Sequence, residues 1–192
     1  ARRRRVVSAA ASDPVRWGFL GAGFVASRAM APAVHATPEA SLQSVAARDR
    51  RRAEALEPRA VGDEYGAVLD DDRVEAVYIS LTNEAHLPWI VKALRAGKHV
   101  LCEKPLTLDA AQARAAFDTA RGVDRLLVEA AWTQWHPRTR RVDAMVRQGD
   151  VGRVRSIAAS FTFDGVPQDN YRLDPTRGGG SLEDLWPFND EA

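Results

Sequence analysis

The sequence predicts an α/β protein built on a doubly wound parallel sheet, followed by the start of a second α/β domain. From Val15 onward, short apolar runs alternate with longer helical stretches, a pattern typical of parallel strands joined by helices. The first apolar run leads directly into a glycine-containing loop. After residue 150 the rhythm changes to one long run of alternating apolar and polar residues, which predicts an open antiparallel sheet.

The strands and helices can be assigned in order along the chain. Strands are expected where apolar and β-branched residues run together, at residues 15–21, 41–47, 74–81, 99–103 and 125–131. Helices are expected where apolar residues recur at helical spacing, at residues 24–36, 50–60, 84–97, 107–122 and 136–152. A further strand is expected at residues 153–163 because polar residues fall at every second position there.

The chain divides into three parts on this interpretation. Residues 1–14, which include four consecutive arginines, are expected to form a disordered tail. Residues 15–150 are expected to form a dinucleotide-binding domain of the Rossmann type. Residues 151–192 are expected to be an incomplete substrate and dimerisation domain, because roughly 40 residues are too few to close a core.

Composition excludes several classes of protein. Of the 192 residues, 45% are hydrophobic and 28% are charged, as in globular proteins with a core. The formal net charge of +1 gives no general attraction for nucleic acid or a membrane surface, and no apolar run has the length of a membrane span. The single cysteine, Cys102, and four scattered histidines predict no metal site. A cytoplasmic protein is the default expectation.

The loop GAGFVA at residues 21–26 follows the first predicted strand and opens the first predicted helix. Gly21 permits a tight turn, Gly23 lets the backbone approach a pyrophosphate, and Ala26 allows the helix to pack closely on the strand. Free N–H groups at the helix start, where Phe24 and Val25 lie, suit phosphate. We therefore predict that a dinucleotide binds Gly21, Gly23, Phe24 and Val25.

The end of the second strand favours NADP over NAD. An NAD-selective site would place Asp or Glu there, to accept hydrogen bonds from the ribose. This chain has Ala47 and then Arg48, with more arginines at residues 50–52. An arginine can pair with a 2′-phosphate, and Asp49 is explained as an N-cap of the next helix. NAD stays the alternative, because some of these arginines form only a solvated helix face.

Three predicted strand ends carry polar and aromatic side chains to one edge of the sheet, where ligands of open α/β sheets bind. Pro105 must stop its strand because proline cannot donate to a ladder. Each side chain has a structural explanation by itself; Thr82, for example, could cap a helix. Their joint placement predicts a site formed by Thr82, Asn83, His86, Glu103, Lys104, Trp132 and His136.

Taken in order, the motifs of this chain resemble those of the Gfo/Idh/MocA oxidoreductases. They are the glycine loop, TNEAH (82–86), GKHVLCEKPL (97–106) and NYRLDPTRGGGSLED (170–184). The resemblance extends from about Val15 to Asp184. The run VEAAWTQWHP (128–137) is similar to the branch that contains dimeric dihydrodiol dehydrogenase and NADP-dependent D-xylose dehydrogenase.

The resemblance implies hydride transfer between a nicotinamide cofactor and a CH–OH group of a sugar, polyol or trans-dihydrodiol. It implies that Lys104 assists proton transfer and that Asp184 is a second catalytic residue. Glu103 and Pro105 match residues that contact the cofactor, often through a cis Lys-Pro bond. The other matched positions are Thr82, Asn83, His86 and Trp132 for the cofactor, and His136 and Arg172 for the substrate.

Departures from the family pattern keep other interpretations open. Trp186 and Phe188 stand where relatives carry a glycine and then a Tyr or His that shares the acid–base work. Gln134 stands where many relatives carry arginine. Relatives also continue beyond this point, so we expect a truncated chain whose full-length parent is a homo-oligomer. A dinucleotide-binding sensor or an inert fragment is the alternative, and a flavin-binding sheet is a weaker one.

Overall fold

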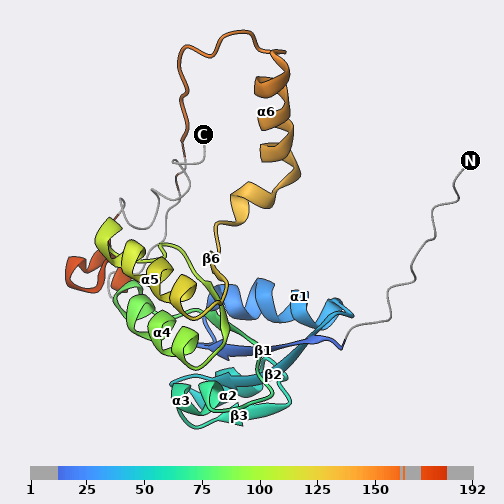
Figure 1. The fold of residues 1–192 in the computed structure, drawn as a ribbon, viewed down its shortest axis with the longest axis vertical. Helices are drawn as coiled ribbons and strands as arrows, with labels where there is room; N and C mark the ends of the chain where they lie inside the picture. Colours follow the sequence, from blue (N-terminus) through green and yellow to red (C-terminus); the bar gives the residue numbers. More distant parts are fainter. Residues whose placement is uncertain (1–12, 161, 163–169, 181–192) are drawn as a thin grey trace, which may run out of the picture. The chain divides into compact units, whose positions relative to one another are not determined.

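The computed structural model describes residues 13–160, 162 and 170–180. Its strands form one six-stranded sheet in the order β3-β2-β1-β4-β5-β6 (Figure 1). The pairs β1–β2, β2–β3 and β5–β6 are parallel. This order is that of the doubly wound dinucleotide-binding sheet, so the predicted fold class is confirmed. The strands are β1 (Val15–Leu20), β2 (Ala40–Ala46), β3 (Ala60–Gly62), β4 (Ala76–Ile79), β5 (His99–Cys102) and β6 (Leu127–Glu129).

Helices connect these strands. The first consists of the π-helical turn η1 (Ala26–Met30) followed by α1 (Ala31–Ala36), and a 3-10 turn, η2 (Trp132–Trp135), precedes the last long helix. Two further 3-10 turns are η3 (Tyr171–Leu173) and η4 (Pro175–Arg177). The remaining helices are α2 (Arg50–Glu54), α3 (Tyr65–Leu69), α4 (Asn83–Arg95), α5 (Ala110–Gly122) and α6 (Pro137–Gln148). No helix of the described residues is long and apolar enough to cross a membrane.

The chain forms two compact units that divide within β4, between Val77 and Tyr78. In the first unit, α1 packs on β2, and α3 packs on β1, β2 and β3. Phe19 and Val45 are fully buried there, because strands covered by helices have apolar side chains on both faces. Asp49 accepts a hydrogen bond from the backbone N–H of Arg51 (3.0 Å), which confirms the predicted N-cap of α2.

The second unit begins at Tyr78 and contains α4, α5 and the last strands. Helix α4 packs on β5 and α5, and its buried residues Ile90 and Leu94 are fully covered. The helix ends at Arg95, two residues before the predicted stop at Gly97, whose φ of 76° is readily adopted by a residue without Cβ. Asp109 caps α5 by accepting a hydrogen bond from the backbone N–H of Gln112 (2.8 Å).

Two expected elements are wrong. The predicted helix over 50–60 ends at Glu54, and residues 60–62 form β3 beside β2, because Pro58 cannot continue a helix; β3 and α3 were not predicted. The expected strand over 153–163 is irregular and exposed at residues 153–160. A strand is stable only beside a partner, and none of the described segments pairs with it.

Candidate cofactor and catalytic site

The glycine loop lies in the first unit, at the end of β1. Gly21 is buried, has a φ of 96° and donates its backbone N–H to Ala46 O (2.8 Å). Only a residue without a side chain adopts this conformation easily. Ala26 is fully buried, as expected for a helix that packs closely on its strand. Phe24, by contrast, is 75% exposed, so the first helical turn faces solvent on its other side.

The arginines after β2 differ in their partners. Arg50 is bound by Glu54 (Nε–Oε1, 2.9 Å) and by Asp63 (Nη1–Oδ1, 2.8 Å), so it belongs to a surface ion-pair network. Arg48 is exposed, and within the described part of the chain no acidic side chain pairs with it. An exposed guanidinium without a carboxylate partner is suited to a phosphate.

In the second unit, the end of β5 is held on both sides by hydrogen bonds. The backbone N–H of Glu103 donates to Ile79 O (2.9 Å), and that of Ala130 donates to Cys102 O (2.7 Å). Strand β5 ends at Cys102, before Pro105, and the Lys104–Pro105 peptide bond is cis, as the resemblance implied. Beyond the turn, Leu106 N–H donates to Glu129 Oε1 (2.7 Å). Lys104 is half-buried at this turn.

Glu103 accepts a hydrogen bond from the hydroxyl of Tyr78 (2.7 Å), a residue of β4 that is fully buried. Burial raises the pKa of Glu103, although the Tyr78 hydrogen bond and the charges of Lys104 and Arg172 act in the opposite direction. Burial also raises the pKa of Tyr78, and the charge of Glu103 adds to this increase. Sequence reasoning missed Tyr78; the signal available was a hydroxyl-bearing residue within an apolar strand, where the hydroxyl needs a partner.

His86 is fully buried beneath this turn. Its Nδ1 lies 2.8 Å from Pro105 O, and its Nε2 lies 3.3 Å from Leu81 O. Burial lowers the pKa of His86, which favours a neutral ring with one N–H. Because both neighbours are carbonyl acceptors, we assign that N–H to Nδ1, at the shorter distance. His86 therefore supports the backbone after Lys104, and its predicted contact with a cofactor stays a prediction.

Asn83, at the start of α4, is 3% exposed and donates its side-chain N–H to Gly178 O (2.7 Å). Nearby, Arg177 Nε pairs with Glu84 Oε1 (3.2 Å). Burial would raise the pKa of Glu84, but hydrogen bonds from its own backbone N–H, Thr82 and Arg177 lower it overall. Thr82 precedes the helix and makes no side-chain hydrogen bond that caps its backbone. These contacts bring residues 170–180 to the start of α4.

Arg172 belongs to this returning segment. Its guanidinium lies 4.7 Å from the ring centroid of Tyr171, and its charge favours the ionised form of Glu103. Arg172 thus contributes to the electrostatic environment of Glu103. Its role with a substrate is untested.

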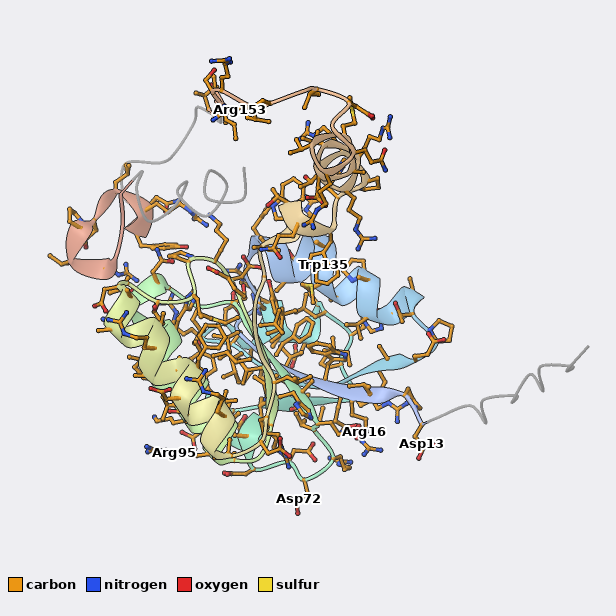
Figure 2. All side chains as sticks on the ribbon, turned by 45° about the horizontal axis from the view of Figure 1, so that its top comes forward. Asp13, Arg16, Asp72, Arg95, Trp135 and Arg153 are labelled. Carbon is orange, nitrogen blue, oxygen red and sulfur yellow. The ribbon has the colours of Figure 1, made fainter. Side chains whose placement is uncertain are left out.

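Trp132 and His136 lie together beyond β6, with ring centroids 6.2 Å apart in an edge-to-face arrangement. His136 Nδ1 also accepts the backbone N–H of Arg138 (3.1 Å) and so caps α6. Trp132 is 53% exposed, and Trp135, labelled in Figure 2, is 64% exposed. Asp184, Trp186 and Phe188 lie outside the described residues. In the described part of the chain, no three His, Cys, Asp or Glu side chains are grouped to hold a metal.

The sheet order and the positive-φ glycine turn at the end of β1 are those of the Rossmann class of dinucleotide-binding folds. Comparison with known proteins identifies the family. The model of the oxidoreductase family with an NAD-binding Rossmann fold, GFO_IDH_MocA, matches residues 15–130. The chain belongs to the Gfo/Idh/MocA oxidoreductase family, which confirms the resemblance of its motifs.

Several characterised proteins are similar to this chain. A dTDP-3,4-didehydro-2,6-dideoxy-alpha-D-glucose 3-reductase of Actinomadura kijaniata is 41% identical over 91% of this chain and 53% of its own length. The D-xylose 1-dehydrogenase (NADP(+)) 2 of Haloferax volcanii is 38% identical, over 88% and 53%. The trans-1,2-dihydrobenzene-1,2-diol dehydrogenase of Mus musculus is 34% identical, over 89% and 53%. The chain thus spans about half the length of these relatives.

The fold is also similar to that of a solved structure. A crystal structure of a 3-ketoreductase from Actinomadura kijaniata, in complex with NADP and TDP-benzene, superimposes with a TM-score of 0.84 at 41% sequence identity. The match covers 90% of this chain and 54% of that one.

Proposed function

We propose that this chain binds NADP and supplies the proton-transferring lysine of an oxidoreductase that interconverts a hydroxyl and a keto group on a sugar. The observation that carries this proposal is the position of Lys104, at the end of a buried parallel strand and between Glu103 and Pro105. Ligands of doubly wound sheets bind beyond the carboxyl ends of the strands. A side chain that transfers protons must also be held in place relative to its substrate.

The residues of the first unit fit a phosphorylated dinucleotide. Gly21 has a φ of 96°, which permits the tight turn after β1, and Ala26 is fully buried, which lets the helix pack closely on that strand. A pyrophosphate can therefore approach the N–H groups at the start of the helix. Arg48 is the residue that we assign to the 2′-phosphate, since no acidic side chain of the described segments neutralises it. One relative has NADP in its name, and one similar solved structure is a complex with NADP; both support this assignment. NAD is the alternative cofactor.

When bound, NADP supplies the acceptor for the hydride that leaves the CH–OH carbon. Lys104 Nζ takes the hydroxyl proton in the oxidative direction and returns it to the keto oxygen in the reductive direction. Glu103 carries the carboxylate next to this lysine, and His86 supports the turn through Pro105 O (2.8 Å). Asn83 holds the segment that carries Arg172 (Nδ2 to Gly178 O, 2.7 Å), and Asp184 stays a proposed second catalytic residue.

A sugar is the favoured substrate class because two of the similar proteins are named for sugar substrates. The similarity to a trans-dihydrodiol dehydrogenase keeps dihydrodiols as an alternative, and polyols follow from the same CH–OH chemistry. A homo-oligomeric parent protein and a cytoplasmic location stay predictions.

Replacement of Lys104 tests this proposal. NADPH binding should be measured by calorimetry, and NADP reduction should be followed with D-xylose, a trans-dihydrodiol and a polyol. Lys104→Ala should lower turnover by about 100-fold or more, the usual contribution of a proton-transferring side chain, and leave the NADPH dissociation constant within about threefold. Lys92→Ala, on the exposed side of α4, is the matched control and should change neither quantity.

The outcomes separate the candidate functions. Turnover that survives Lys104→Ala would contradict the catalytic assignment. Binding of NADPH without turnover of any substrate would favour the sensor or inert-fragment alternative. A chain that binds neither NADPH nor NADH would contradict the proposed function entirely.

A further inference from the structure

Two hydrogen bonds hold Glu103, the residue before the proposed catalytic lysine. Tyr78 is fully buried in β4 and donates its hydroxyl to Glu103 Oε1 at 2.7 Å. Glu103 is followed directly by Lys104, whose charge favours the ionised form of the Glu103 carboxylate. The backbone of Glu103 is held in turn by Ile79 O (2.9 Å). Glu103, the residue before Lys104, is therefore held by Tyr78 through its side chain and by Ile79 through its backbone.

The hydroxyl of Tyr78 has no evident packing function. A phenylalanine would fill the same buried space in β4, and the burial of a hydroxyl is unfavourable unless the hydroxyl finds a hydrogen-bond partner. Glu103 is also partly removed from water, and burial raises its pKa. Two polar groups that are both costly to bury are thus placed against each other at the end of β5. This arrangement restricts the rotamers of the Glu103 side chain.

We propose that Tyr78 is a positioning residue, which acts through Glu103 to fix Lys104 at the nicotinamide end of the cofactor. This inference rests on the proposed function, because it needs NADP as the ligand of the chain. Tyr78 itself is fully buried and is not assigned any contact with cofactor or substrate. Its influence should therefore reach only the part of the cofactor that Lys104 meets.

The Tyr78→Phe variant tests the inference with two ligands. NADPH contains the nicotinamide, whereas 2′-phospho-ADP-ribose contains only the adenosine, the phosphates and the second ribose. Tyr78→Phe should weaken NADPH binding by about 3- to 10-fold, as expected for one hydrogen bond, and leave 2′-phospho-ADP-ribose binding unchanged. Arg48→Ala should weaken both ligands. Tyr65→Phe, a hydroxyl deletion in α3, should weaken neither.

A second measurement observes the lysine directly. The chain contains only three lysines, Lys92, Lys98 and Lys104, so reductive ¹³C-methylation yields few lysine signals in an NMR spectrum. Tyr78→Phe should shift the Lys104 signal and leave those of Lys92 and Lys98 in place. Glu103→Gln should shift the same signal. In the double variant the Lys104 signal should shift little more than in the single variant with the larger shift, because both changes remove the same Tyr78–Glu103 contact.

Cooperative thermal unfolding of each variant confirms that it is folded, and Glu103→Gln serves if Tyr78→Phe does not fold. An unshifted Lys104 signal in a folded variant would overturn the inference, and so would equal weakening of both ligands. If the parent chain binds neither ligand, the proposed function fails and this inference fails with it. If the parent chain binds both and Tyr78→Phe binds both as well as the parent does, the inference alone fails.

Discussion

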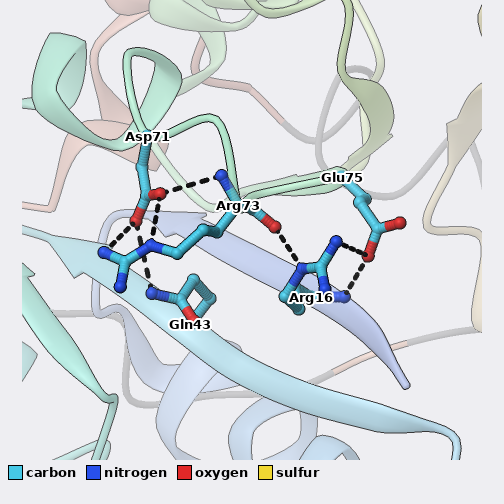
Figure 3. A network of polar contacts seen from close by, with 5 residues as sticks. All are labelled: Arg16, Gln43, Asp71, Arg73 and Glu75. Carbon is cyan, nitrogen blue, oxygen red and sulfur yellow. Dashed lines mark hydrogen bonds and ion pairs between the residues drawn. The ribbon is translucent and has the colours of Figure 1, made fainter. Parts of the chain in front are cut away.

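Asp71 shows how one residue joins neighbouring strands of the first unit (Figure 3). Its Oδ1 accepts the backbone N–H and Nε–H of Arg73, both at 2.9 Å, and its Oδ2 accepts Arg73 Nη2 (3.0 Å) and Gln43 Nε2 (3.3 Å). The Arg73 carbonyl in turn accepts Arg16 Nε of β1 (2.6 Å), and Arg16 pairs with Glu75 (3.3 Å). Because the Asp71 side chain is only 13% exposed, these bonds are partly shielded from water.

Asp71 should make stability depend on pH. The Arg73 side-chain hydrogen bond, opposed by burial and supported by Gln43, lowers the pKa of Asp71. The folded state therefore favours the ionised carboxylate. This stabilisation is complete above the unfolded-state pKa and is lost as pH falls through the lower folded-state pKa. Asp71→Asn should reduce the free energy of unfolding by about 1–2 kcal/mol at pH 7, as measured by urea unfolding.

The difference between Asp71→Asn and the parent chain should shrink as the pH falls through the folded-state pKa. Asp72→Asn, a change at the next residue of the same turn, is the control and should have a much smaller effect. A loss of stability in Asp71→Asn that is equally large in strong acid would contradict the electrostatic explanation.

At the level of elements, Gly18 of β1 lies very close to helix α3 and to the segment just before β4. A Cβ at Gly18 would lie 2.5 Å from Val68 Cγ1 and 2.9 Å from Val74 Cγ1, and both valines are buried. The pairing register of β1 with β2 also shifts between Trp17 and Gly18. The glycine thus permits α3 and the segment before β4 to pack directly on the β1 backbone.

Gly18→Ala should therefore destabilise the fold. The added methyl group must displace two buried side chains, which typically costs about 1–3 kcal/mol. The measurement is the free energy of unfolding in urea. Gly122→Ala at the end of α5 is the matched control, because a Cβ there meets nothing within 4 Å. An unchanged stability in Gly18→Ala would show that the valines move apart more easily than their burial suggests.

At the level of the whole molecule, the bond from Asn83 to Gly178 (2.7 Å) joins residues 95 positions apart in the sequence. It is buried, and the adjacent Arg177–Glu84 ion pair is partly exposed, with side-chain exposures of 39% and 35%. Gly178 has a φ of 72°, and a Cβ there would collide with Leu108. The buried amide bond, more than the ion pair, should hold residues 170–180 in place.

Asn83→Ala should release this segment, because it leaves the Gly178 carbonyl without its buried donor at a cost of about 1–3 kcal/mol. Hydrogen exchange should be faster at the N–H groups of Gly179 and Gly180, which bond to Asp174 O and Arg172 O. Arg177→Ala should have a smaller effect, because partly exposed ion pairs contribute about 0–1 kcal/mol. Equal acceleration by both variants would contradict the ranking.

The sequence alone predicts the repeating strand–helix order, the glycine turn at Gly21 and the end of β5 before Pro105. Each of these depends on local chemistry: hydrophobic periodicity, the conformational freedom of glycine and the missing N–H of proline. It also placed Asn83, Glu103 and Lys104 at neighbouring strand ends, because parallel strands share one carboxyl edge. The strand expected at 153–163 failed for the opposite reason, since a strand depends on a partner that its own residues do not encode.

The contacts of the side chains at that edge follow from tertiary packing. The bond from Tyr78 to Glu103 and the contact of His86 with Pro105 O link residues that are 25 and 19 positions apart. Such contacts depend on strand register and helix packing, which no local pattern specifies. The structure shows that His86 is fully buried and supports the turn through Pro105 O, whereas its predicted contact with a cofactor stays a prediction.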